Sequence, residues 1–164
     1  MSTSFKSCNI SYRLIVVVVV IFFFSCKQLD LFEKNNPIPN HSWSSRYSSN
    51  AQFLITDTNA FYNIFIILRH TDAYKYNNIW LNVGIKVPND TMQFKKLNLV
   101  LGEDSKGWEG TGMGDIWHLK KRINSRPYKF KKSGVYEFSI LNIMRDDPLL
   151  EIMSVGISVE KLGQ

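Results

Sequence analysis

The chain has 164 residues, 45% of them hydrophobic and 21% charged, a balance that excludes a disordered or low-complexity protein. Twenty Lys and Arg residues against 14 Asp and Glu residues give a net charge of +6, which is a mild basic excess. Two cysteines are too few for a disulfide-stapled scaffold, so the fold must rely on a hydrophobic core.

Residues 1–25 have the order of a secretory signal peptide. Lys6 and Arg13 precede an unbroken apolar run over residues 14–24, and a small residue follows it. As a helix, this run would span about 16 Å, roughly half of a ~30 Å hydrocarbon core, which argues against an uncleaved membrane anchor. An exported chain of this kind also argues against nucleic acid as a partner.

Cys26 follows the small residue Ser25, an order that resembles a bacterial lipobox. In a lipobox the cysteine thiol takes a diacylglyceryl group, the preceding peptide is removed, and the new N-terminus is acylated. We therefore predict lipidation of Cys26. Because Lys27 follows it, and not the aspartate that favours inner-membrane retention in enteric bacteria, we expect the outer membrane. Phe23 stands where leucine is commonest, so a plain signal peptide cut near Ser25 remains the alternative.

Residues 26–42 are predicted to be a lipidated N-terminus and tether, because Pro37 and Pro39 push the chain toward extended conformations. Cys8 would leave with the signal, so the mature chain cannot form an internal disulfide. A basic cluster lies further on, and it comprises Lys120, Lys121, Arg122, Arg126, Lys129, Lys131 and Lys132. We favour a solvated strand pair and turn for this cluster; a patch facing acidic lipid head groups or acidic glycans is the alternative.

Apolar residues alternate with polar ones over 51–55, 79–87 and 153–159, which is the pattern of half-buried strands. The stretch 61–68 is nearly all apolar and predicts a central strand covered on both faces. A change of parity predicts a β-bulge at Lys95–Lys96. With turn signals between these runs, residues 43–164 are predicted to form one all-β domain: a single antiparallel β-sandwich of about seven to nine strands with little helix.

The densest polar cluster is Arg69-His70-Thr71-Asp72, at the end of the apolar stretch 61–68. A histidine followed by an aspartate two residues on could act as a base and its orienter. No nucleophile motif such as Gly-x-Ser-x-Gly accompanies it, however. We favour a structural loop network, in which the side chains of Thr71 or Asp72 bond to backbone N–H groups.

Residues 102–115 form a glycine-rich segment that suggests a long loop or a hairpin tip. Its acidic residues are Glu103, Asp104, Glu109 and Asp115. Oxygen ligands on a turning loop suit calcium, but Lys106 places a cation where a helix-loop-helix calcium loop needs a ligand. The glycines also lack the order of a phosphate-binding loop, and the three histidines lack zinc spacing, so we predict no metal and no cofactor.

Five aromatic residues lie in or beside the two longest connections: Tyr74, Tyr76, Trp80, Trp108 and Trp117. Exposed aromatic rings can stack on sugars or anchor a protein partner. They can equally pack beneath long loops as a satellite cluster. The sequence leaves both interpretations open.

Three segments together resemble the gliding-motility lipoprotein family GldH of Bacteroidota. They read FYNIFIILRHTDAYKYNNIWLNV at 61–83, DTMQFKKLNLVLGEDSKGWEGTGMGDIW at 90–117 and GVYEFSILNI at 134–143. The Arg-His-Thr-Asp turn followed by two tyrosines and a tryptophan is the most specific part. The tryptophan- and glycine-rich loop at 108–115 comes next.

This resemblance implies a non-enzymatic envelope lipoprotein, attached to the membrane by its N-terminal lipid and linked with gliding and type IX secretion. It implies other envelope proteins as partners and supplies no catalytic residues. The candidate interface residues are Arg69, His70, Asp72, Tyr74, Tyr76, Trp80, Trp108, Asp115 and Trp117. The alternative is a glycan-binding β-sandwich lipoprotein at the cell surface, with sugars stacked on Trp80 and Trp108; an enzyme is the third hypothesis.

Overall fold

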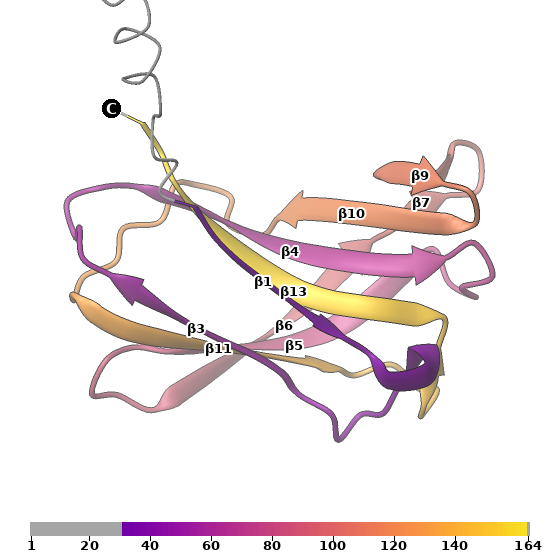
Figure 1. Ribbon diagram of the computed structural model, residues 1–164, viewed down its shortest axis with the longest axis horizontal. Helices are drawn as coiled ribbons and strands as arrows, with labels where there is room; N and C mark the ends of the chain where they lie inside the picture. The colour runs from indigo at the N-terminus through magenta and orange to yellow at the C-terminus, as the bar shows by residue number, and fades with distance from the viewer. Residues whose placement is uncertain (1–30, 164) are drawn as a thin grey trace, which may run out of the picture.

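The computed structural model describes residues 31–163, which form two packed antiparallel β-sheets (Figure 1). The five-stranded sheet has the order β1 (Leu31–Pro37), β13 (Ile152–Lys161), β4 (Tyr62–Thr71), β10 (Ile116–Arg122) and β9 (Thr111–Met113). The four-stranded sheet has the order β3 (Ser49–Ile55), β11 (Gly134–Asn142), β5 (Asn78–Lys86) and β6 (Met92–Val100). The prediction of an all-β sandwich is confirmed.

Two short strand pairs lie at one end of the sandwich. β2 (Ser42–Trp43) pairs with β12 (Leu149–Leu150), and β7 (Gly102–Glu103) pairs with β8 (Gly107–Trp108). The one helical element of residues 31–163 is the 3-10 turn η1 (Pro39–His41). A helix that could cross a bilayer is therefore absent from this part of the chain.

The core between the sheets is rich in stacked aromatic rings. The ring centroid of Phe53, on β3, lies 5.2 Å from that of Phe138 and 5.8 Å from that of Tyr136, both on β11. Phe130 meets Tyr136 edge to face at 4.7 Å. Such pairs add to the stability that their burial supplies. Trp43 is also fully buried, and its indole N–H donates to the Tyr47 carbonyl oxygen at 2.9 Å.

β4 is the central strand of the larger sheet, with β13 on one side and β10 on the other. Ile66, Ile67 and Leu68 are all fully buried, although successive side chains point to opposite faces. The prediction of a central strand is confirmed, but β4 is covered along its length only on its inner face: on the outer face Ile67 is buried, and Asn63, Phe65, Arg69 and Thr71 are half-buried.

The predicted β-bulge at Lys95–Lys96 is wrong. β6 pairs with β5 in unbroken register from Asn78↔Val100 to Lys86↔Met92. β6 is an edge strand, and both lysines are exposed. The parity of the sequence changes because this part of β6 has solvent on both faces, so no apolar side is required there.

The predicted tether is wrong for residues 31–42. Residues 31–37 form β1, which pairs along its whole length with β13. Two asparagines of β1 also bond to neighbouring strands: the Asn35 amide donates to Ser154 Oγ of β13 at 3.1 Å, and the Asn36 amide donates to Ser49 Oγ of β3 at 2.8 Å. Because β1 is an edge strand, it also tolerates a proline at its end. The predicted signal peptide, Cys26 and residues 26–30 of the tether lie outside the described residues.

The strands run between two opposite ends of the sandwich (Figure 1). We call the basal end the one where β1 begins, together with residues 55–62, 122–134 and 161–163. We call the distal end the opposite one, formed by the loops 72–77, 101–115 and 143–151.

Candidate functional site

The two segments singled out by the sequence, 69–80 and 108–117, meet at the distal end. β4 and β10, which carry parts of both, are neighbours in the same sheet. Beyond the strands, the Asp72 N–H donates to the Asp115 carbonyl oxygen at 2.8 Å. The loop after β4 and the glycine-rich loop therefore form one continuous surface.

His70, Tyr74 and Trp108 form the floor beneath this surface. His70 is fully buried and Tyr74 is 4% exposed. The centroid of the His70 ring lies 4.7 Å from that of Trp108 and 5.6 Å from that of Tyr74. The Tyr74 hydroxyl donates to the Asn78 carbonyl oxygen at 3.1 Å. His70 and Tyr74, both candidate interface residues, are thus too buried to touch a partner; they hold the loops from below.

The contacts of His70 do not suit general-base catalysis. Its Nδ1 lies 2.8 Å from the Thr71 carbonyl oxygen, which can only accept, so Nδ1 carries the ring proton. Nε2 has no hydrogen-bond partner within residues 31–163. Asp72 is exposed and does not orient the ring. Burial lowers the pKa of His70 and raises the pKa of Tyr74, because it penalises the charged form of each.

The other candidates lie on three different surfaces. Asp72 and Asp115 are exposed at the tips of the distal loops, and Trp117 is half-buried beside them. Trp80, 42% exposed, lies on the outer face of the four-stranded sheet. Arg69 lies on the outer face of the five-stranded sheet, beside a pocket of about 670 Å³. The fold therefore does not bring Arg69 and Trp80 together.

Sequence reasoning missed two acidic residues at the distal end. Asp146 Oδ2 accepts a hydrogen bond from the Tyr76 hydroxyl at 2.8 Å, and Glu151 Oε2 accepts one from the Thr71 hydroxyl at 2.7 Å. The first bond raises the pKa of Tyr76 and lowers the pKa of Asp146. The only local signal is the Asp146-Asp147-Pro148 run, which predicts a turn but no partner.

A pocket of about 510 Å³ lies between residues 73–76 and 146–151. Tyr76 and Asp146 line it, and so does Leu150, which is 58% exposed. The pocket therefore combines a phenol, a carboxylate and an apolar rim, which suits contact with a polar protein surface.

The glycine-rich segment offers no convergent set of calcium ligands. Glu103 is ion-paired with Lys106 at 2.6 Å, and Glu109 is ion-paired with Lys121 at 2.6 Å. In the part of the chain that the structure describes, no three His, Cys, Asp or Glu residues are grouped to hold a metal ion. Two of the four acidic residues that suggested calcium are instead paired with lysines.

A sugar-stacking platform would need Trp80 and Trp108 on one surface. Trp80 points outward from the four-stranded sheet, whereas Trp108 is half-buried with its ring set edge-on to buried His70. The two rings therefore do not share a face, and no observation here favours the glycan alternative.

Comparison with known proteins points to one family. The family model described as GldH lipoprotein matches residues 30–159. A gliding motility lipoprotein GldH homolog of Christiangramia forsetii is 28% identical, covering 84% of this chain and 87% of the relative. The gliding motility lipoprotein GldH of Flavobacterium johnsoniae is 25% identical, covering 84% and 89%. A structure of the infectious bursal disease virus VP2 subviral particle covers 84% of this chain and 34% of that one at 13% identity, but its TM-score of 0.29 is too low to carry an argument.

Proposed function

The chain belongs to the GldH lipoprotein family, and from this we propose that it is a non-enzymatic lipoprotein that acts by binding other envelope proteins. In this proposal Cys26 carries the lipid and the outer membrane is the site of attachment. The partners belong to the machinery of gliding and of type IX secretion. Family membership carries the proposal, because the relatives that match over most of their length bear the gliding-motility name.

The distal surface supports a binding role through its organisation. Its accessible side chains are mixed in character: Asp72 and Asp115 are acidic, Tyr76 offers a phenol edge, and Leu150 is apolar. The buried floor and the bond between the Asp72 N–H and the Asp115 carbonyl oxygen hold these loops in place. A surface that is already ordered loses little conformational entropy when a partner docks.

The test is co-purification from detergent-solubilised envelopes with the double variant Tyr76→Ala, Leu150→Ala, which truncates two side chains of the distal pocket. Aromatic anchors of protein interfaces cost at least about 2 kcal/mol when truncated, so we expect recovery of a bound envelope protein to fall roughly 30-fold. Leu54→Ala is the matched control, because Leu54 is an apolar residue, 63% exposed, on β3 near the basal end.

Normal partner recovery with a double variant that unfolds at the wild-type temperature would contradict this proposal. Retention of a surface polysaccharide by the wild type, with its loss in Trp80→Ala, would favour the glycan-binding alternative instead. The Leu54→Ala control must recover the partner normally for either result to be read as specific to the distal end.

A further inference from the structure

The basal end of the sandwich lies very close in sequence to the predicted lipid. β1 begins at Leu31, five residues after Cys26. A chain spans at most ~3.5 Å per residue, so Leu31 can be no more than about 17 Å from the Cα of Cys26. Both Leu31 and the end of β13 lie at this end (Figure 1). A lipid on Cys26 would therefore hold the basal end near the bilayer.

Apolar side chains are exposed at the basal end. Phe61 is 51% exposed, Leu31 is 45% exposed and Tyr128 is 39% exposed. Backbone hydrogen bonds of 2.8 Å join Tyr62 with Tyr128 in both directions, so the loops that carry Phe61 and Tyr128 lie side by side. A pocket of about 610 Å³ is lined by Phe61, Arg126 and Pro127 and, on its other side, by Leu162 and Gly163.

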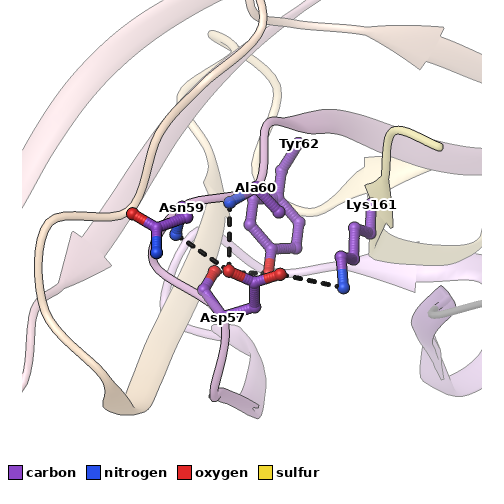
Figure 2. A network of polar contacts seen from close by, with 5 residues as sticks. All are labelled: Asp57, Asn59, Ala60, Tyr62 and Lys161. Atoms are coloured by element: carbon purple, nitrogen blue, oxygen red, sulfur yellow. Dashed lines mark hydrogen bonds and ion pairs between the residues drawn. The ribbon is translucent and has the colours of Figure 1, made fainter. Parts of the chain in front are cut away.

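The loop that presents Phe61 is fastened by Asp57, as Figure 2 shows. Asp57 Oδ1 accepts the N–H groups of Asn59 and Ala60 at 2.9 and 3.1 Å, and Oδ2 is ion-paired with Lys161 at 3.0 Å. The Tyr62 hydroxyl donates to the Asp57 carbonyl oxygen at 2.8 Å. The exposure of Phe61 is thus a property of an ordered loop.

The same end carries an excess of positive charge. No acidic residue occurs from Ile116 to Tyr136. Within residues 31–163, five basic side chains of this stretch have no ion-pair partner: Arg122, Arg126, Lys129, Lys131 and Lys132. Lys129 Nζ lies 5.9 Å from the centroid of the exposed Phe61 ring. Lys120, by contrast, is neutralised by Glu33 at 3.3 Å and Glu160 at 2.6 Å.

We propose that the basal end is a membrane-contact surface that rests on the anionic phospholipid head groups of the bilayer holding the lipid anchor. Tyr128 lies at head-group level, where amphipathic aromatic rings are favoured, and Phe61 places its apolar ring at the boundary between head groups and acyl chains. The unpaired basic residues contact lipid phosphates. The inference rests on the lipidation in the proposed function. It also gives the molecule an orientation, because the distal loops then point away from the bilayer toward partners.

The test uses the lipidated full-length mature protein in vesicles of equal parts phosphatidylglycerol and phosphatidylcholine. With Cys26 in a thioether, Ser125→Cys or Ser105→Cys supplies the one reactive thiol for a fluorescent label. Ser125 is exposed at the basal end, and Ser105 is exposed in the β7–β8 turn at the distal end. We expect head-group spin-labelled lipid to quench the label at 125 several-fold more than the label at 105.

Charge neutralisation provides the second arm. Each basic residue near an anionic leaflet contributes roughly a fivefold factor in binding, so Arg126→Gln with Lys129→Gln should weaken contact about 25-fold and reduce quenching at 125 to the level seen at 105. Lys95→Gln with Lys96→Gln is the matched control, because it removes two exposed lysines of β6 that have no ion pair within residues 31–163, and it should leave quenching unchanged. Pure phosphatidylcholine vesicles should resemble the Arg126→Gln, Lys129→Gln variant.

Mass spectrometry of the N-terminal peptide reads lipidation of Cys26 separately. A lipidated protein with equal quenching at 125 and 105, or with quenching independent of phosphatidylglycerol, would overturn the membrane contact and leave the proposed function standing. An unlipidated Cys26 would overturn the anchor on which both rest. Protection of the label at 125 by an acidic polysaccharide, and not by anionic vesicles, would identify a glycan as the occupant and overturn the inference.

Discussion

His70 shows how a single polar residue can take a packing role. Its ring fills the space between Trp108 and Tyr74, and its one hydrogen bond is local, to the Thr71 carbonyl oxygen. Protonation would place a charge in the core, which is why burial lowers the pKa of His70. In the unfolded chain a histidine titrates near pH 6.5. The unfolded state therefore binds more protons as the pH falls below that value, and stability declines.

His70→Phe tests this linkage, since it keeps a buried ring and removes the titrating group. We expect a change within about 1 kcal/mol at neutral pH, because one hydrogen bond is lost and one unsatisfied nitrogen is removed. Between neutral pH and a pH just below the unfolded histidine value, the wild type should lose more stability than the variant. Urea unfolding at both pH values measures the difference.

His41→Asn is the matched control for His70→Phe. His41 is exposed and has a positive φ of 52°, which asparagine accepts. This control retains His70, so its loss of stability on acidification should exceed that of His70→Phe. A His70→Phe variant with the same pH dependence as the wild type would show that another group is responsible.

At the scale of elements, β1 depends on Gly156 of β13. A Cβ added to Gly156 would overlap the Lys34 carbonyl oxygen and lie 2.7 Å from the Asn35 Cα, and both atoms belong to the backbone of β1. Side chains can rotate away from such a contact, but a paired backbone cannot. Gly156 therefore permits the close approach that makes β1 part of the sheet.

Gly156→Ala should detach or displace β1. Overpacking of this kind costs typically 1–3 kcal/mol, so we expect a loss of roughly that size in the free energy of unfolding. Amide hydrogen exchange should accelerate in residues 31–37 more than in β4. Gly163→Ala is the control, because a Cβ there would have no neighbour within 4 Å. Equal stability of the two variants would show that β1 adapts without cost.

At the scale of the whole molecule, the Asp57 network joins the two sheets. The loop 56–61 connects β3 of the smaller sheet to β4 of the larger one, and Lys161 is the last residue of β13. The Asp57 carboxylate accepts hydrogen bonds from the Lys161 side chain and from the N–H groups of Asn59 and Ala60. These bonds lower the pKa of Asp57. A carboxyl group with a lowered folded-state pKa stabilises the fold above its unfolded value of about 3.9, and this contribution is lost as the pH falls through the folded-state pKa.

Asp57→Asn should therefore destabilise the protein at neutral pH, and its difference from the wild type should shrink as the pH falls through the acid range. The urea midpoint at neutral, mildly acidic and strongly acidic pH measures this. Asp104→Asn is the matched control, since Asp104 is exposed and its carboxylate has no hydrogen bond or ion pair within residues 31–163. If the difference in urea midpoint between Asp57→Asn and the wild type stays constant with pH, the ionised Asp57 carboxylate is not the stabilising group.

Parts of the fold follow from short-range pattern. The alternation over 79–87 predicts β5, and the apolar stretch 61–68 predicts a central strand, because the period of side chains along a strand is a local property. Residues 31–37 could not be predicted in this way. β1 has few apolar residues, and its stability comes from the β13 backbone and from the amides of Asn35 and Asn36.

The sequence likewise predicts some features of the candidate site and not others. The sequence places His70, Tyr76 and Trp108 in the two segments that meet at the distal end, yet it predicts a loop at His70, which lies in β4. It cannot tell that His70 is buried or that Tyr76 donates to Asp146, 70 residues further on. It also groups Arg69 with His70 in one loop, because the predicted strand ends at residue 68; β4 continues to Thr71, so the two side chains point to opposite faces.

By itself, then, the sequence determined the family resemblance, the all-β class and the predicted export signal, because each is encoded in contiguous residues. The tertiary structure decided that residues 31–42 belong to the sandwich, which aromatic residues are accessible, and which residues share an end. Leu31 lies beside Glu160, and Tyr62 bonds to Tyr128, only because the folded chain pairs distant segments. Such contacts join residues far apart in sequence, so no local pattern records them.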